Sequence, residues 1–221
     1  MKNIKLKTAF ILVLGLSITG CAKSPKLTNN LKLTEEKIII KGHKWKVKIF
    51  TNKISPKGVF WFLPHDNENT AEESARYAVK KYGGGYLKIC ANNQREFKGI
   101  DPNRYFNNNK FANKIIEIIN RYRTDKVPYL TLHNNTNGGG VSILRGNQDD
   151  IRYKAHKHIT KGHGGLSDED SLVYIAGKNI QQSDINALTK KGLNVISEKT
   201  TTSNNDGSMS NYIALKSNPN C

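Results

Sequence analysis

The residues best suited to chemistry lie in a short polar segment that follows an apolar run. Residues 59–63 read Val-Phe-Trp-Phe-Leu, which is typical of a buried strand. After Pro64 come His65 and Glu68, an imidazole and a carboxylate three residues apart. Zinc accepts both ligand types, and a catalytic zinc site has three protein ligands and one position for water. The pair therefore predicts two ligands of a metal site and requires a third from elsewhere.

His133 is the histidine that repeats the context of His65. It follows an apolar run over residues 127–132 and opens a loop rich in asparagine and glycine. If both runs are strands of one parallel sheet, both histidines lie at the same carboxyl edge, where α/β proteins build their sites. The alternative is two separate, hydrogen-bonded histidines without a metal, because the spacing H-x-x-E often arises by chance.

Two further polar groups lie between these histidines. Arg95 follows a strand-like run over residues 86–91, and residues 101–104 read Asp-Pro-Asn-Arg, which is typical of a turn. An arginine side chain binds carboxylates as a planar fork and can polarise a carbonyl beside a metal. The alternative is a plain turn and ordinary exposed arginines.

Together these groups resemble the succinylglutamate desuccinylase/aspartoacylase family of the zinc carboxypeptidase clan. That family carries an H-G-N-E box, an arginine, a D-L-N-R box and an L-H-N-T box. In the same order this chain has residues 65–68 (His-Asp-Asn-Glu), Arg95, residues 101–104 and residues 132–136 (Leu-His-Asn-Asn-Thr). The likeness covers roughly residues 59–140. Asp66, Pro102 and Asn135 depart from the boxes, but none of these changes removes a ligand.

The resemblance implies zinc-dependent hydrolysis of an amide bond in a small peptide or N-acyl amino acid that has a free carboxylate. It implies one role for each matched residue. His65, Glu68 and His133 would be the zinc ligands. Arg95 would polarise the substrate carbonyl. Asn103 and Arg104 would bind the substrate carboxylate.

Enzymes of this clan also use a glutamate on a late strand as general base. After His133 the chain has two glutamates, Glu169 and Glu198, and neither has a matching context. Three alternatives stay open: the chain is truncated at its C-terminus, Glu198 substitutes, or the protein is a catalytically inactive lipoprotein that binds zinc and a carboxylate ligand. A structural envelope lipoprotein without metal is a further alternative.

The N-terminus predicts export. Three lysines precede an apolar core that is too short to span a membrane, and residues 18–21 read Ile-Thr-Gly-Cys. This pattern resembles a bacterial lipoprotein signal over residues 1–20, with lipidation of Cys21 and a tether over residues 21–34. An ordinary cleaved signal or an uncleaved anchor are the alternatives. We expect a lipid-anchored protein of the cell envelope, on the outer membrane or the periplasmic face, where Cys90 and Cys221 could pair.

The net charge is +17, and near +14 without the three lysines of residues 1–20. It predicts either the solvated surface of a lysine-rich chain or attraction to anionic material such as phospholipid head groups or cell-wall peptides. Nucleic acid is disfavoured as a partner, because the lysines are dispersed, no helix-turn-helix or RNA-binding motif is present and the export signal directs the chain elsewhere.

Residues 35–221 are long enough for a single α/β domain. Apolar periodicity alternates between strands and helices, which predicts a mainly parallel (mixed) central sheet with helices on both faces, as in zinc carboxypeptidases. Helix 70–82 would be capped by Thr70 together with Glu73. The other expected elements are a hairpin over 37–50, a helix over 111–122, a helix over 183–191, and strands over 59–63, 86–91, 127–132, 141–144, 172–176 and 193–197.

Overall fold

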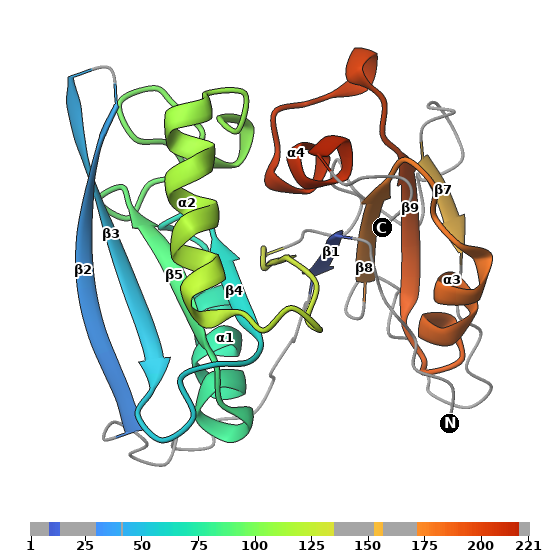
Figure 1. The fold of residues 1–221 in the computed structure, drawn as a ribbon, viewed down its shortest axis with the longest axis horizontal. Coiled ribbons are helices and arrows are strands. Elements are labelled where there is room, and N and C mark those ends of the chain that lie inside the picture. Colours follow the sequence, from blue (N-terminus) through green and yellow to red (C-terminus); the bar gives the residue numbers. More distant parts are fainter. Residues whose placement is uncertain (1–8, 14–29, 41, 135–152, 157–171, 217–221) are drawn as a thin grey trace. The chain divides into compact units, whose positions relative to one another are not determined.

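The computed structural model describes residues 9–13, 30–40, 42–134, 153–156 and 172–216 (Figure 1). The chain divides into two compact units. One consists of residues 17–127, and we call it the 17–127 unit. The other consists of residues 128–221 together with residues 1–16, and we call it the 128–221 unit. Within the described ranges, no helix is long and apolar enough to cross a membrane.

The sheet of the 17–127 unit has the strand order β2-β3-β5-β4. Its strands are β2 (Leu31–Ile40), β3 (His43–Asn52), β5 (Gly85–Cys90) and β4 (Phe60–Leu63). Strands β2 and β3 form the predicted hairpin, β3 pairs antiparallel with β5, and β4 pairs parallel with β5. Residues 31–34, which the sequence assigned to the tether, belong to strand β2 and pair with β3.

Two helices cover opposite faces of this sheet. They are α1 (Asn69–Tyr82) and α2 (Asn109–Tyr122). The ring of Trp45 on β3 lies 5.4 Å from that of Phe111 on α2, whereas the guanidinium of Arg76 on α1 lies 5.5 Å from the ring of Phe50. Trp45 and Phe50 are an odd number of residues apart on one strand, so their side chains point to opposite faces. The predicted helix over 111–122 is confirmed.

The predicted capping box of helix α1 is wrong. The residue before the helix is Glu68, which makes no side-chain capping bond, and the helix begins at Asn69, so Thr70 lies inside it. The Glu68 carboxylate instead contacts the His65 ring. The free backbone N–H groups at the start of a helix can bond to groups other than a capping side chain. The Glu68 side chain is therefore available to contact His65.

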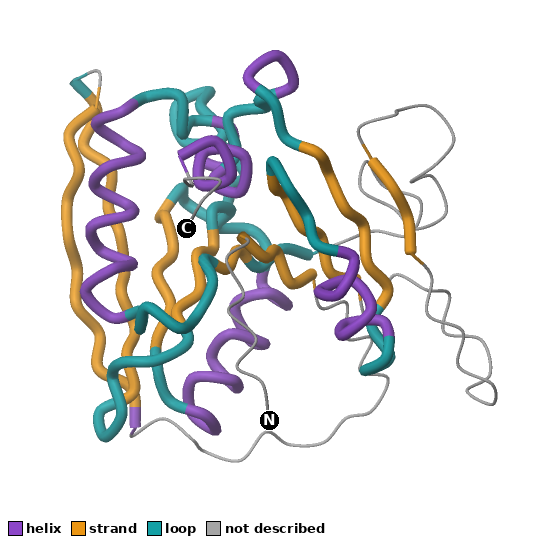
Figure 2. Tube along the Cα trace, turned by 45° about the vertical axis from the view of Figure 1, so that its right-hand side comes forward, coloured by secondary structure: helices purple, strands orange, loops and turns teal. Residues whose placement is uncertain are grey.

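The 128–221 unit has the strand order β6-β1-β8-β9-β7. Its elements are β1 (Ala9–Val13), β6 (Leu130–Thr131), β7 (Tyr153–His156), β8 (Leu172–Gly177), α3 (Gln182–Thr189), β9 (Asn194–Lys199) and α4 (Met209–Lys216). Strands β8 and β9 are parallel (Figure 1). The chain passes from one to the other through α3, which Figure 2 draws in purple, and the three elements expected there are confirmed. The strand expected over 127–132 is reduced to two residues, β7 was not predicted, and the strand expected over 141–144 lies outside the described residues.

Strand β1 falls within the predicted signal peptide. It pairs parallel with β6 and antiparallel with β8. The predicted cleavage after residue 20 and the lipidation of Cys21 stay predictions, since Cys21 lies outside the described residues.

Each unit is thus α/β with a mixed sheet. The sheet is not mainly parallel as predicted, because the described strands of each unit include antiparallel pairs. In the 17–127 unit these are β2–β3 and β3–β5. In the 128–221 unit they are β1–β8 and β7–β9. Apolar periodicity identifies a strand but not the direction of its neighbour, so the sequence could not predict how many strand pairs are antiparallel.

Candidate metal centre

His65 is held in place by the strand that precedes it. The residues of β4 are all buried, and His65, two residues beyond the end of this strand, is buried as well, with 2% of its surface exposed. Its Nδ1 lies 2.6 Å from Glu68 Oε1 and its Nε2 lies 2.9 Å from Asp101 Oδ1. Burial lowers the pKa of His65, but the hydrogen bonds to the two carboxylates outweigh burial and raise it.

Asp101 orients the His65 ring. Its Oδ1 also accepts the backbone N–H of Asn103 at 2.7 Å, because Asp101 caps the short 3-10 helix Pro102–Arg104. Burial raises the pKa of Asp101, but the hydrogen bond from His65 and the other contacts lower it to about 2. A carboxylate on one ring nitrogen fixes the tautomer and leaves the other nitrogen for a metal. The sequence indicated Asp101 only as the start of a turn.

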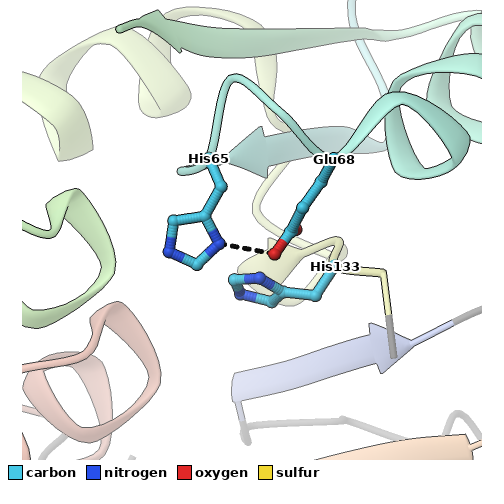
Figure 3. A group of neighbouring side chains, drawn as sticks. All are labelled: His65, Glu68 and His133. Atoms are coloured by element: carbon cyan, nitrogen blue, oxygen red, sulfur yellow. Dashed lines mark hydrogen bonds and ion pairs between the residues drawn. The ribbon is translucent and has the colours of Figure 1, made fainter. Parts of the chain in front are cut away.

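His65, Glu68 and His133 form a group that could hold a metal ion (Figure 3). Each offers one ligand atom, and these atoms lie within 4.8 Å of one another. Two imidazoles and one carboxylate suit zinc and several other transition metals. The 2.6 Å between His65 Nδ1 and Glu68 Oε1 is shorter than the ~3.3 Å between two ligands of a tetrahedral zinc ion, so binding would move these atoms slightly apart.

Arg95 lies beside two of the carboxylates. Its Nη1 is 3.6 Å from Glu68 Oε1 and its Nη2 is 3.3 Å from Asp101 Oδ2, while about half of the side chain is exposed. The structure therefore brings the predicted catalytic arginine next to a predicted ligand and next to the residue that orients His65.

Asn103 and Arg104 follow Asp101 in the 3-10 helix. Asn103 is buried, and its amide oxygen accepts no hydrogen bond from the part of the chain that the structure describes. Arg104 is exposed. Their predicted role in binding a substrate carboxylate stays a prediction.

Asp66 is a positioning residue that sequence reasoning did not identify. Its Oδ2 accepts the backbone N–H groups of Ala91 at 2.8 Å and Asn93 at 2.9 Å, and its Oδ1 lies 2.7 Å from Lys88 Nζ. Burial raises the pKa of Asp66, but these contacts lower it overall. Asn93 has a φ of 59°, which asparagine tolerates. Asp66 thus ties the loop that carries His65 to the loop that leads to Arg95.

Glu198, the weak candidate for the general base, lies inside β9 rather than beyond it. It is fully buried, and its Oε1 accepts a hydrogen bond from Asn211 Nδ2 at 3.3 Å. Cys90 is half-buried and forms no disulfide with any described residue, and its suggested partner Cys221 lies outside that part of the chain.

The donor set, the orientation of His65 by Asp101 and the position of Arg95 together define a candidate metal centre. They do not distinguish zinc from other metals that accept the same ligands. No protein-family model, curated protein or solved structure matches this chain.

Proposed function

We propose that this protein is a zinc-dependent amidohydrolase. Its substrate would be a small peptide or N-acyl amino acid with a free carboxylate. The observation that carries the proposal is the hydrogen-bonded arrangement of His65 with Glu68 and with Asp101, to which His133 adds the third possible ligand. A carboxylate behind a ligating histidine is the usual support of a metal site.

A zinc ion held by these residues would act as a Lewis acid that polarises an amide carbonyl and activates water. The chain itself supplies orientation. Asp101 keeps His65 Nε2 protonated, so that Nδ1 carries the lone pair for the metal. Arg95 Nη1 lies 3.6 Å from Glu68 Oε1 and its Nη2 lies 3.3 Å from Asp101 Oδ2. Beside a zinc ion held there, its guanidinium would stabilise the developing oxyanion.

Arg104 would bind the free carboxylate of the substrate. Its side chain is exposed and follows directly on Asn103, so both belong to the short helix that Asp101 caps. A bidentate guanidinium contact fixes the orientation of a carboxylate as well as its position. Loss of this contact would weaken substrate binding and leave the metal in place.

Two features of the sequence support an envelope location for this activity. These are the lipoprotein-like signal that ends at Cys21 and the net charge of +17. Both are compatible with an anchored protein that acts on anionic envelope fragments such as cell-wall peptides.

Elemental analysis and native mass spectrometry of the full chain test the metal centre. We expect about one zinc per chain for the wild type, and His133→Ala should lose it because one of three ligands is gone. His43→Ala is the matched control, since His43 is exposed at the start of β3. Wild-type protein that takes up no zinc from a metal-replete buffer, with His133→Ala behaving like His43→Ala, would overturn the proposal.

A second candidate is a zinc-retaining, inactive binding lipoprotein. It is favoured by the position of Glu198, the weak candidate for the general base, because this side chain is fully buried and hydrogen-bonded to Asn211. A screen of acyl amino acids and muropeptides separates the two. The enzyme hydrolyses at least one of them and loses catalytic efficiency in Arg104→Ala, whereas the binding protein retains zinc, binds a carboxylate ligand through Arg104 and hydrolyses none.

A further inference from the structure

A basic and aromatic patch lies at one end of the 17–127 unit, on the last two turns of α1 and the loop that follows β3. Among the described residues, the three most exposed large hydrophobic side chains all belong to it: Ile54 is 84% exposed, Tyr82 71% and Tyr77 58%. Large hydrophobic side chains that gather on a surface among polar groups mark an interaction site. Three lysines complete what we call the tyrosine–lysine patch: Lys53, Lys80 and Lys81.

The Asn52 side chain joins the loop to the helix. Its Nδ2 donates to the Val79 carbonyl oxygen at 3.0 Å. Its Oδ1 accepts the backbone N–H groups of Ile54 at 2.9 Å and Ser55 at 3.0 Å. The backbone N–H of Gly84 donates to the Ser55 carbonyl oxygen at 2.7 Å. These bonds hold the loop against the C-terminal end of α1, so the two segments form one surface.

Lys81 holds its charge beside both tyrosines. Its Nζ lies 3.1 Å from Tyr77 Oη, 5.4 Å from the centre of the Tyr77 ring and 5.2 Å from that of the Tyr82 ring. These distances are typical of cation–π contacts, in which an ammonium group lies over an aromatic face. Tyrosine and lysine have apolar bodies and polar tips, and both are favoured where a protein meets lipid head groups.

The segments that form the patch contain no carboxylate. Residues 37–65 and residues 74–95 include no Asp or Glu. The nearest acid along α1 is Glu73, which precedes Tyr77 by about one turn. None of the three lysines forms an ion pair with a residue that the structure describes. The patch therefore presents positive charge to an anionic partner.

The patch lies at the end of the unit where β2 begins. The backbone N–H of Lys53 donates to the Asn30 carbonyl oxygen at 2.9 Å, next to the first residue of β2. Figure 1 shows the start of β2 and the end of β3 together at the lower end of this unit. Cys21, the predicted lipidation site, precedes Asn30 by nine residues, and nine residues span at most about 30 Å. A lipid on Cys21 would keep this end of the unit close to a membrane.

His65 lies beyond the opposite edge of the sheet. Strand β5 begins with Gly85, which pairs with Thr51 near the end of β3, and β4 runs parallel to β5. His65 follows the end of β4, so the length of these strands separates it from the loop after β3. A membrane that contacts the patch would leave His65 and its loop on the side that faces water.

We propose that the tyrosine–lysine patch docks on the surface of an anionic lipid bilayer. Ile54, Tyr77 and Tyr82 enter the head-group region, and the lysines lie among the lipid phosphates. The inference rests on the proposed envelope location for its choice of partner and deepens it by naming the face that meets the membrane. It depends neither on the metal nor on hydrolysis.

Vesicle sedimentation of the full chain tests this surface. Cys21→Ser is present in every variant, so that binding is measured without a lipid on that residue. We expect this parent protein to bind vesicles of phosphatidylglycerol and phosphatidylethanolamine more tightly than vesicles of phosphatidylcholine, and the difference should shrink at high salt. Lys53→Gln/Lys81→Gln should lower the affinity for the anionic vesicles about tenfold or more, because two surface charges are removed.

Lys190→Gln/Lys191→Gln is the matched control for charge. It removes two exposed lysines at the end of α3 and should bind like the parent protein. A second pair of variants tests the apolar contact. Ile54→Ser should lower the affinity about fivefold, whereas Ile39→Ser, at the other end of β2, should leave it unchanged.

Two results would overturn the proposal. One is equal binding of the parent protein to anionic and to phosphatidylcholine vesicles. The other is an equal affinity in the two double lysine variants, which would indicate general charge attraction only. Circular dichroism checks that the variants fold. Their zinc content should match that of the parent protein, so failure of the docking surface and failure of the metal centre are distinguishable.

Discussion

The Lys88 ammonium group on β5 lies 2.7 Å from Asp66 Oδ1, within the loop that separates His65 from Glu68. The same ammonium lies 2.6 Å from Glu72 Oε2 on α1. Burial lowers the pKa of Lys88, but these two carboxylates raise it overall, so the group is cationic at neutral pH. Lys88 thus connects the loop between His65 and Glu68 to helix α1, which follows that loop.

Removal of the Asp66 charge should weaken metal binding without removing a ligand. We expect Asp66→Asn to lower zinc affinity about tenfold, because the loop between His65 and Glu68 loses its tie to Lys88 and to the Ala91 backbone. The free energy of unfolding should fall by about 2 kcal/mol, since Lys88 keeps a partly buried charge with one partner fewer. Chelator competition and urea unfolding measure the two effects.

Lys46→Gln is the control for Asp66→Asn. It breaks the exposed pair between Lys46 and Glu35, in which both side chains are more than two-fifths exposed. Exposed pairs contribute little to stability, so this variant should change neither quantity. Equal effects in the two variants would contradict the positioning role of Asp66.

Asp101→Asn tests the orientation of His65. The amide cannot hold the Nε2 proton as a carboxylate does, so zinc affinity should fall about tenfold or more although all three ligands remain. Asp125→Asn is the control, because the Asp125 carboxylate is fully exposed and 4.0 Å from Arg123. Unchanged zinc affinity in Asp101→Asn would show that the hydrogen bond to His65 has no role in metal binding.

Glu72 should contribute to acid stability. Burial raises its pKa, but Lys88 and Arg76 lower it below the ordinary value of 4.5. A carboxyl whose folded pKa is lowered stabilises the fold above its unfolded pKa, and this stabilisation is lost as the pH falls through the folded value. Glu72→Gln should therefore lower the free energy of unfolding by about 1 kcal/mol at pH 7. The deficit should shrink below pH 4.5.

Urea unfolding at pH 7 and at acidic pH measures this dependence. Glu73→Gln removes the same charge from the exposed neighbouring position of α1 and should show no such convergence. A deficit in Glu72→Gln that stays constant as the pH falls would rule out the ionised carboxyl as its source.

Gly84→Ala should disrupt the approach of β5 to the segment before β4. A Cβ at Gly84 would lie 1.9 Å from the Val59 carbonyl oxygen, and φ is +80°. Gly42 has a similar φ of +75° but nothing within 4 Å of its added Cβ. We expect Gly42→Ala to cost about 1 kcal/mol of unfolding free energy and Gly84→Ala about 3 kcal/mol or more, because only the second adds a backbone clash. Equal denaturation midpoints would contradict this.

The sequence by itself determined the local elements and the residues with reactive side chains. Apolar alternation and helical periodicity predicted the β2–β3 hairpin, α2 and the order β8-α3-β9, because these patterns depend on residues close together in the chain. The types and order of His65, Glu68, Arg95 and His133 indicated metal chemistry for the same reason. The start of α1 was misjudged, because Glu68 contacts His65 rather than the helix end.

Only the tertiary structure decided which side chains meet. Asp101 reaches His65 across 36 residues of sequence, and Lys88 reaches Asp66 through the pairing of β5 with β4. Strand order and direction depend on which faces pack together, and the periodicity of a single strand does not predict which strand pairs with it. For that reason the supporting carboxylates could be identified only in the folded chain.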